Sequence, residues 1–219
     1  TNYEGVLPED IPEAGIPNGL WIAGVTDQIY TGVSLKPEIR VYDGNKRLKS
    51  GIDYTANYKN NKKANDASNT KTAPTIVVKG KGNYAGTETA SFKIFPVDLT
   101  DQSISTDTIT QAYNEKIQKP IPVICFNGKK LKNKTDFTLT YPDVGIDAYK
   151  AIGTYHIKVV GRGNFTGEID IPFTVTDSVL ITKAKVNSVP VHTYNDGRSI
   201  EPIPIVRMGK EDVIEGTDD

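Results

Sequence analysis

The sequence has little of what marks several large protein classes. Its 219 residues contain one cysteine, Cys125, which excludes an internal disulfide. The 26 basic and 27 acidic residues balance, so the composition gives no electrostatic case for nucleic-acid binding. No apolar run approaches the roughly 18 residues that span a bilayer, so we expect no membrane insertion. The chain begins without a charged and then apolar secretion signal, and we expect it to be a piece of a larger protein.

What the sequence does contain favours an all-β fold. Many Thr, Val, Ile and Tyr residues stand in short runs between 13 prolines and 19 glycines. Ile39 and Val41 alternate with Arg40 and Tyr42, which is the period of a half-buried strand. Several such runs separated by turn residues predict a two-sheet sandwich.

An internal repeat organises the chain. Residues 36–55 align without a gap with residues 119–138, an offset of 83. A glycine-rich stretch at Gly80–Gly86 returns at Gly161–Gly167, an offset of 81, so the first copy carries two extra residues before it. A third copy starts near Tyr194, and the chain stops before the second half of that copy.

These offsets predict four segments. They are an extended lead-in over 1–19, one repeat over 20–98, a second over 99–178 and a partial third over 179–219. We expect the partial copy to be ordered, covering an edge of the second module or pairing with a neighbouring chain. Its expected core residues are Val191, Ile203, Ile205 and Val213.

The glycine-rich stretches read as hairpin turns. Each follows one apolar strand and precedes another, whereas a phosphate-binding glycine loop should open a helix. An aromatic residue kept at such a turn closes one end of a sandwich. We therefore expect Tyr84 and Phe165 to be buried, with Lys81 and Arg162 exposed beside them.

Several motifs give the chain a family resemblance. It resembles the tandem immunoglobulin-like repeats of large cell-wall-anchored surface proteins of Gram-positive gut bacteria. The resemblance implies secretion, surface display and roles from passive spacer to adhesin, including binding of host immunoglobulin in the manner of a superantigen. The motifs that carry it are Tyr30–Gly32, Lys36–Pro37, Gly51–Thr55, Tyr58–Asn61 and Gly80–Gly86. The second copy departs from them where Lys134 and Thr135 replace Gly51 and Ile52, and Pro142 and Asp143 replace Lys59 and Asn60.

The residue patterns give little support for chemistry. Cys125 and His156 are expected within strands, where nothing activates a thiol, so we predict no catalytic residue and no enzyme. His192 lacks partners at metal-ligand spacing. Turn formation explains Asp43, Asp66 and Asp196 better than calcium binding does, because no calcium-loop spacing is present. We predict no metal and no cofactor.

Two functions from different classes therefore stay open. In one the chain is a structural stalk, and in the other it binds a host extracellular protein such as an immunoglobulin. Arg40 and Tyr42 alternate away from the predicted core, and both residue types are enriched in binding hot spots. The loop of unequal length is a normal place for recognition on a rigid scaffold. The predicted partner-binding residues are Arg40, Tyr42, Lys59, Asn60, Asn61, Lys62 and Lys63.

Overall fold

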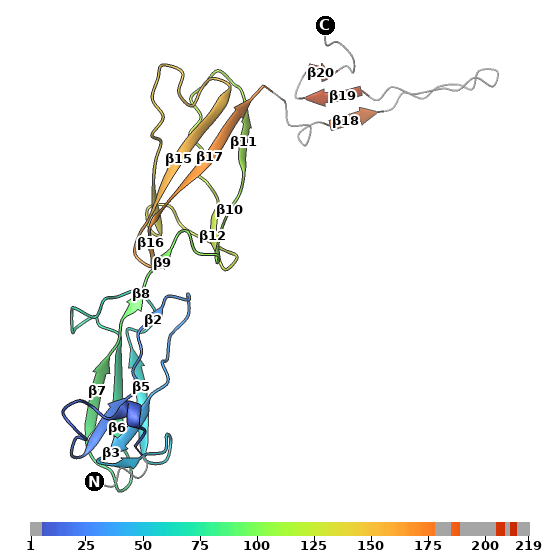
Figure 1. The fold of residues 1–219 in the computed structure, drawn as a ribbon. Helices are drawn as coiled ribbons and strands as arrows, with labels where there is room; N and C mark the ends of the chain where they lie inside the picture. The colour runs from blue at the N-terminus through green and yellow to red at the C-terminus, as the bar shows by residue number, and fades with distance from the viewer. Residues whose placement is uncertain (1–5, 178–184, 189–204, 209–210, 214–219) are drawn as a thin grey trace. The chain divides into compact units, whose positions relative to one another are not determined.

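The computed structural model describes residues 6–177, 185–188, 205–208 and 211–213. Within these ranges the chain is built of β-strands, and its only helical segment is the short 3₁₀ helix η1 (Pro8–Asp10) (Figure 1). The strands form several sheets, so the predicted all-β, sandwich-like fold class is confirmed. No helix in these ranges is long and apolar enough to cross a membrane.

The segment from residue 20 to residue 98 contains three sheets of its own. β1-β3-β4 and β5-β6-β7 are antiparallel, and β2 pairs with β8 in parallel. A further short strand, β9, leaves this group for a later partner. The strands are β1 (Leu20–Ala23), β2 (Gln28–Ile29), β3 (Arg40–Asp43), β4 (Lys46–Arg47), β5 (Tyr54–Lys59), β6 (Thr75–Gly80), β7 (Thr87–Ser91), β8 (Ile94–Phe95) and β9 (Val97–Asp98).

The segment from residue 99 to residue 177 pairs its strands in a related way. One sheet has the order β10-β12-β13, another has the order β11-β17-β15-β14, and β16 pairs with β9. The strands are β10 (Ile104–Thr106), β11 (Ile109–Ala112), β12 (Ile124–Phe126), β13 (Lys129–Lys130), β14 (Phe137–Thr140), β15 (Gly153–Gly161), β16 (Phe165–Thr166) and β17 (Glu168–Thr176).

The offsets seen in the sequence recur in the strand registers. Tyr54 is the partner of Gly80 in β5 and β6, and Phe137 is the partner of Gly161 in β14 and β15. The parallel pairs agree as well, because Gln28 faces Ile94 and Gln111 faces Val175. Residues 83 or 81 positions apart in the sequence therefore hold equivalent places in the ladders.

The chain divides into two compact units whose limits differ from the predicted repeat boundaries. One unit comprises residues 1–108, 120–142 and 156–171, and the other comprises 109–119, 143–155 and 172–219. β15 and β17 each contribute residues to both units. The boundaries at residues 98 and 178 therefore remain predictions from the sequence.

The predicted core positions are buried in both segments. One cluster joins Val41, Leu48, Tyr54, Ile76, Val78, Phe92 and Ile94. The matching residues Phe137, Ile157, Val159, Phe173 and Val175 are also buried. These side chains alternate along their strands with exposed ones, as the period of two predicts.

The described part of the lead-in folds back onto β1 and β3 instead of remaining extended. Val6 is buried, and Ile11 and Ile16 pack against the cluster that it forms with Trp21, Ala23 and Tyr42. The Trp21 indole donates a hydrogen bond to the Gly44 carbonyl at 2.8 Å. The outer face of this small sheet thus becomes a second core because apolar residues of the lead-in cover it.

The two glycine-rich turns differ in how deeply they bury their aromatic residue. Phe165 is buried and Arg162 and Lys81 are exposed, as predicted, whereas Tyr84 is only partly buried against its core cluster. A cation–π contact places Lys46 Nζ 5.3 Å from the centre of the Tyr84 ring, on its open side. The prediction of a buried residue is therefore confirmed for Phe165 and is wrong for Tyr84.

Near the C-terminus, three short strands form a sheet of their own. β18 (Lys185–Ser188), β19 (Ile205–Met208) and β20 (Glu211–Val213) pair antiparallel in that order. Val191 and Ile203, two of the residues expected in the core here, lie outside the described residues. Docking of this segment on a module edge or on another chain stays a prediction.

Candidate partner-binding surface

Tyr42, predicted as an exposed binding residue, is fully buried. Its ring stacks on Trp21 with centroids 4.6 Å apart, and its hydroxyl donates a hydrogen bond to Asp10 Oδ2 at 2.7 Å. Burial raises the pKa of the Tyr42 phenol, and the Asp10 carboxylate raises it further. The prediction of a binding role for Tyr42 is wrong because the lead-in covers the strand face on which the residue lies.

Arg40 lies beside it and is engaged in the same cluster. Its guanidinium donates to both carboxylate oxygens of Asp10, whose side chain is 1% exposed while that of Arg40 is 27% exposed. Hydrogen bonds from Arg40 are the main cause that lowers the pKa of Asp10. A bidentate pair with a buried carboxylate fixes the lead-in on β3, and it leaves Arg40 poorly suited to bind a partner.

The remaining predicted residues lie together in the loop that follows β5. Lys59, Asn60, Lys62 and Lys63 are exposed, and Asn61 is partly buried. The loop starts sharply because Asn60 adopts a left-handed conformation with φ of 56°, which Asn tolerates better than most residues.

The two asparagines anchor this loop from inside. Asn60 Nδ2 donates to the Ala73 carbonyl at 3.2 Å, and Asn61 Nδ2 donates to the Leu35 carbonyl. The Leu35 amide in turn donates to the Asn61 carbonyl at 2.8 Å. The sequence grouped these amides with the binding residues, but they shape the loop and leave contact with a partner to the lysines.

Backbone contacts hold the far end of the loop. The Ala64 amide donates to Asn164 Oδ1 at 2.9 Å, and Asn65 and Ile94 exchange two backbone hydrogen bonds of 2.9 Å. All of these residues belong to the first compact unit. The loop is therefore fixed before any partner arrives, which reduces the entropy lost on binding.

Three lysines project from this fixed frame. Lys59, Lys62 and Lys63 form no ion pair with any residue that the structure describes. An open hollow of about 400 Å³ lies beside the loop and is lined by Asn60, Lys62, Lys63, Ala64, Asn65 and Thr72. Uncompensated cations around a hollow suit an anionic group on a partner protein. We call Lys59, Lys62 and Lys63 with this hollow the lysine loop.

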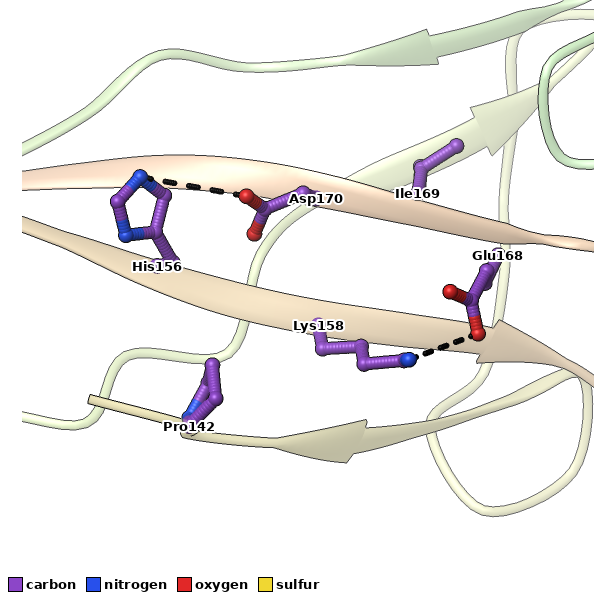
Figure 2. A pocket seen from close by; sticks show the side chains of 6 residues that line it. All are labelled: Pro142, His156, Lys158, Glu168, Ile169 and Asp170. Atoms are coloured by element: carbon purple, nitrogen blue, oxygen red, sulfur yellow. Dashed lines mark ion pairs between the residues drawn. The ribbon is translucent and has the colours of Figure 1, made fainter. Parts of the chain in front are cut away.

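A second hollow, of about 480 Å³, lies over β15 and β17 (Figure 2). Figure 2 shows two ion pairs across it: His156 Nε2 lies 4.0 Å from Asp170, and Lys158 Nζ lies 2.9 Å from Glu168. All four side chains are 44–61% exposed, so water screens each pair and its contribution to stability is small. The pairs nest around one hairpin, a pattern of opposite charges that the sequence displays and that we did not use.

The residues considered for chemistry are spread over the fold. Cys125 lies in β12, whereas His156 lies in β15 of another sheet and pairs with Asp170. No group of three potential metal ligands occurs among the described residues. Asp66 accepts hydrogen bonds from the Ser68 amide at 3.0 Å and hydroxyl at 2.7 Å, which supports its predicted role in a turn. His192 and Asp196 lie outside the described residues.

Fold and surface together define an all-β, sandwich-like protein with a preformed cationic loop. Neither the models of known protein families nor the curated proteins include a match to this chain. A function must therefore be inferred from the geometry of the chain and from its motifs.

Proposed function

We propose that this chain is a non-catalytic module of a bacterial cell-surface protein and that its lysine loop binds a host extracellular protein. The surface setting rests on the motif resemblance, and an immunoglobulin is the partner that the resemblance suggests. The observation that carries the binding role is the lysine loop itself. Its backbone is held at both ends while its lysines have no acidic partner among the described residues.

The loop has the physical properties of a recognition element. Side-chain amides and backbone groups fix its path, so a partner does not have to order it. Lysine ammonium groups attract an acidic surface over several ångströms, and salt weakens this attraction. The expected partner surface is therefore acidic, and binding should be weaker at high ionic strength.

A passive stalk is the second candidate, and the linker after β8 favours it. Only Pro96 separates β8 from β9, and the Val97 and Leu99 amides donate to the Asn164 and Thr166 carbonyls at 3.0 and 2.9 Å. Tyr30, Phe126 and Phe165 form three ring contacts with centroids 5.4–5.7 Å apart. All of these residues lie in the first compact unit. A linker held in this way suits a spacer.

The binding role is tested by biolayer interferometry with the immobilised chain and purified host immunoglobulin, as intact protein, Fab and Fc. Lys62→Ser/Lys63→Ser should weaken binding at least tenfold, and raising the salt concentration should weaken binding to the unmodified chain. Lys129→Ser/Lys130→Ser is the matched control, because these exposed lysines of β13 carry the same charge elsewhere. Absence of binding, or equal loss in both variants, would reject the proposed loop and favour the stalk.

A further inference from the structure

The loop between β14 and β15 carries the most exposed aliphatic residues of the described chain. Val144 is 93% exposed, Ile146 is 98% exposed and Ile152 is 57% exposed. In sequence order this loop corresponds to the lysine loop, which lies between β5 and β6. The two loops therefore differ in chemistry, one cationic and the other aliphatic. Large apolar side chains are not held so far out in water without a cost.

Tyr149 holds this aliphatic loop in one conformation. Its hydroxyl accepts a hydrogen bond from the Asp143 amide at 2.8 Å and donates one to Asp143 Oδ2 at 3.0 Å. Because Tyr149 itself is 2% exposed, this bond closes the segment from Asp143 to Tyr149 over a buried ring. Val144 and Ile146 lie within the closed segment.

Neighbouring groups fix Tyr149 in turn. The Gln118 amide donates to its carbonyl at 2.7 Å, and the Tyr155 ring lies 4.9 Å from its ring. The Tyr155 hydroxyl donates to the Ala151 carbonyl at 2.9 Å and to the Asp147 carbonyl at 3.2 Å. Val144 and Ile146 are thus presented by a braced loop, and the aliphatic pair does not result from a loose chain. All of these residues belong to the second compact unit.

We propose that Val144 and Ile146 are the apolar anchors of a second binding surface, which inserts into an apolar pocket of a partner protein. The carboxylates of Asp143 and Asp147 lie within or beside the same closed segment, and the Asp147 side chain is 60% exposed. Charge complementarity therefore calls for basic groups at the rim of the partner's pocket. Rigid aliphatic anchors inside a polar rim are the usual arrangement of a hot spot.

A lipid surface fits these residues less well. The two side chains carry fewer carbon atoms than one myristoyl chain, and even that chain alone gives only marginal membrane binding, with a constant of about 10⁴ M⁻¹. Bacterial and host membranes with anionic headgroups would also repel Asp143 and Asp147. A protein pocket needs only a few well-placed anchors, and the braced loop supplies them.

The test uses a phage library of disulfide-cyclised peptides, selected on the immobilised whole chain after depletion on Val144→Ser/Ile146→Ser. Enriched peptides should combine aliphatic or aromatic residues with Lys or Arg, and they should bind the unmodified chain at least tenfold more tightly than the depletion variant. Lys62→Ser/Lys63→Ser should leave their affinity unchanged, which separates this surface from the lysine loop. Because the replaced side chains are almost fully exposed, the thermal midpoint should not change.

A second variant keeps both anchors and tests the brace. Tyr149→Phe removes the hydroxyl that closes the loop, so the selected peptides should lose affinity even though Val144 and Ile146 remain. The proposal is overturned if no peptides survive depletion. It is also overturned if Val144→Ser/Ile146→Ser abolishes binding to phosphatidylcholine or phosphatidylserine vesicles, or abolishes self-association in sedimentation equilibrium, since those results identify a lipid or a second copy as the occupant.

Discussion

At the scale of single residues, Phe165 and Tyr84 occupy the same place in two related turns but differ in burial. Phe165 contacts Tyr30 and Phe126 edge to face, with centroids 5.7 and 5.4 Å apart. Tyr84 keeps one side open, where Lys46 lies over it. The sequence places an aromatic residue at both turns, but it does not show that only one of them meets other rings from distant parts of the chain.

Replacement of these two residues should therefore have unequal effects. Phe165→Ala should lower the free energy of unfolding by about 3–5 kcal/mol, because it removes a buried ring. Tyr84→Ala should cost clearly less, since part of its ring is already in water. Urea titration measures both values, and a loss below about 1 kcal/mol for Phe165→Ala would contradict the burial of its ring.

The Asp10 and Arg40 pair predicts a pH dependence of stability. The folded state lowers the pKa of Asp10 below that of the unfolded chain, about 3.9. Its stabilising contribution is therefore complete above that value and is lost as the pH falls through the lower folded pKa. Asp10→Asn should lower the urea midpoint near pH 7, and the difference from the unmodified chain should shrink as the pH approaches about 3. A difference that does not depend on pH would show that the ion pair contributes nothing.

At the scale of elements, the glycine-rich turns need glycine for two different reasons. A Cβ atom on Gly80 would lie 2.6 Å from the Tyr84 carbonyl oxygen, and one on Gly161 would lie 2.6 Å from the Thr166 nitrogen. Gly82 instead has φ of 61° and no atom within 4 Å of such a Cβ. The first two positions require space, whereas Gly82 requires only a left-handed backbone.

Asparagine at the two positions separates these requirements. Gly82→Asn should cost less than about 1 kcal/mol, because Asn enters the left-handed region more easily than other residues with a side chain. Gly80→Asn should cost about 1–3 kcal/mol or more, since the turn must open to admit a Cβ atom. Thermal unfolding of both variants checks the order, and equal midpoints would show that Gly80 is not closely packed.

The sequence predicted the elements better than it predicted the surfaces. Period-two alternation and the repeat offsets located the buried residues Ile76, Val78, Ile157 and Val159. They could not show that the lead-in returns to cover Tyr42, because its short apolar residues lack any period. They also could not separate the structural amides of Asn60 and Asn61 from the lysines beside them, since that difference depends on distant carbonyls.

At the scale of the whole molecule, contacts join residues far apart in the chain. Tyr30 and Phe165 are in ring contact although 135 positions separate them, and both lie in the first compact unit. A double-mutant cycle with Tyr30→Ala and Phe165→Ala should give a coupling energy of about 0.5–1.5 kcal/mol. Additive effects would show that the two rings do not interact.

The central claim is that the lysine loop binds a host protein. Hydrogen exchange of the whole chain, followed by mass spectrometry with and without purified host immunoglobulin, tests it most directly. Bound immunoglobulin should slow exchange of the amides in residues 59–66, and Lys62→Ser/Lys63→Ser should abolish that protection while Lys129→Ser/Lys130→Ser preserves it. Unchanged exchange over residues 59–66 at saturating immunoglobulin would contradict the claim.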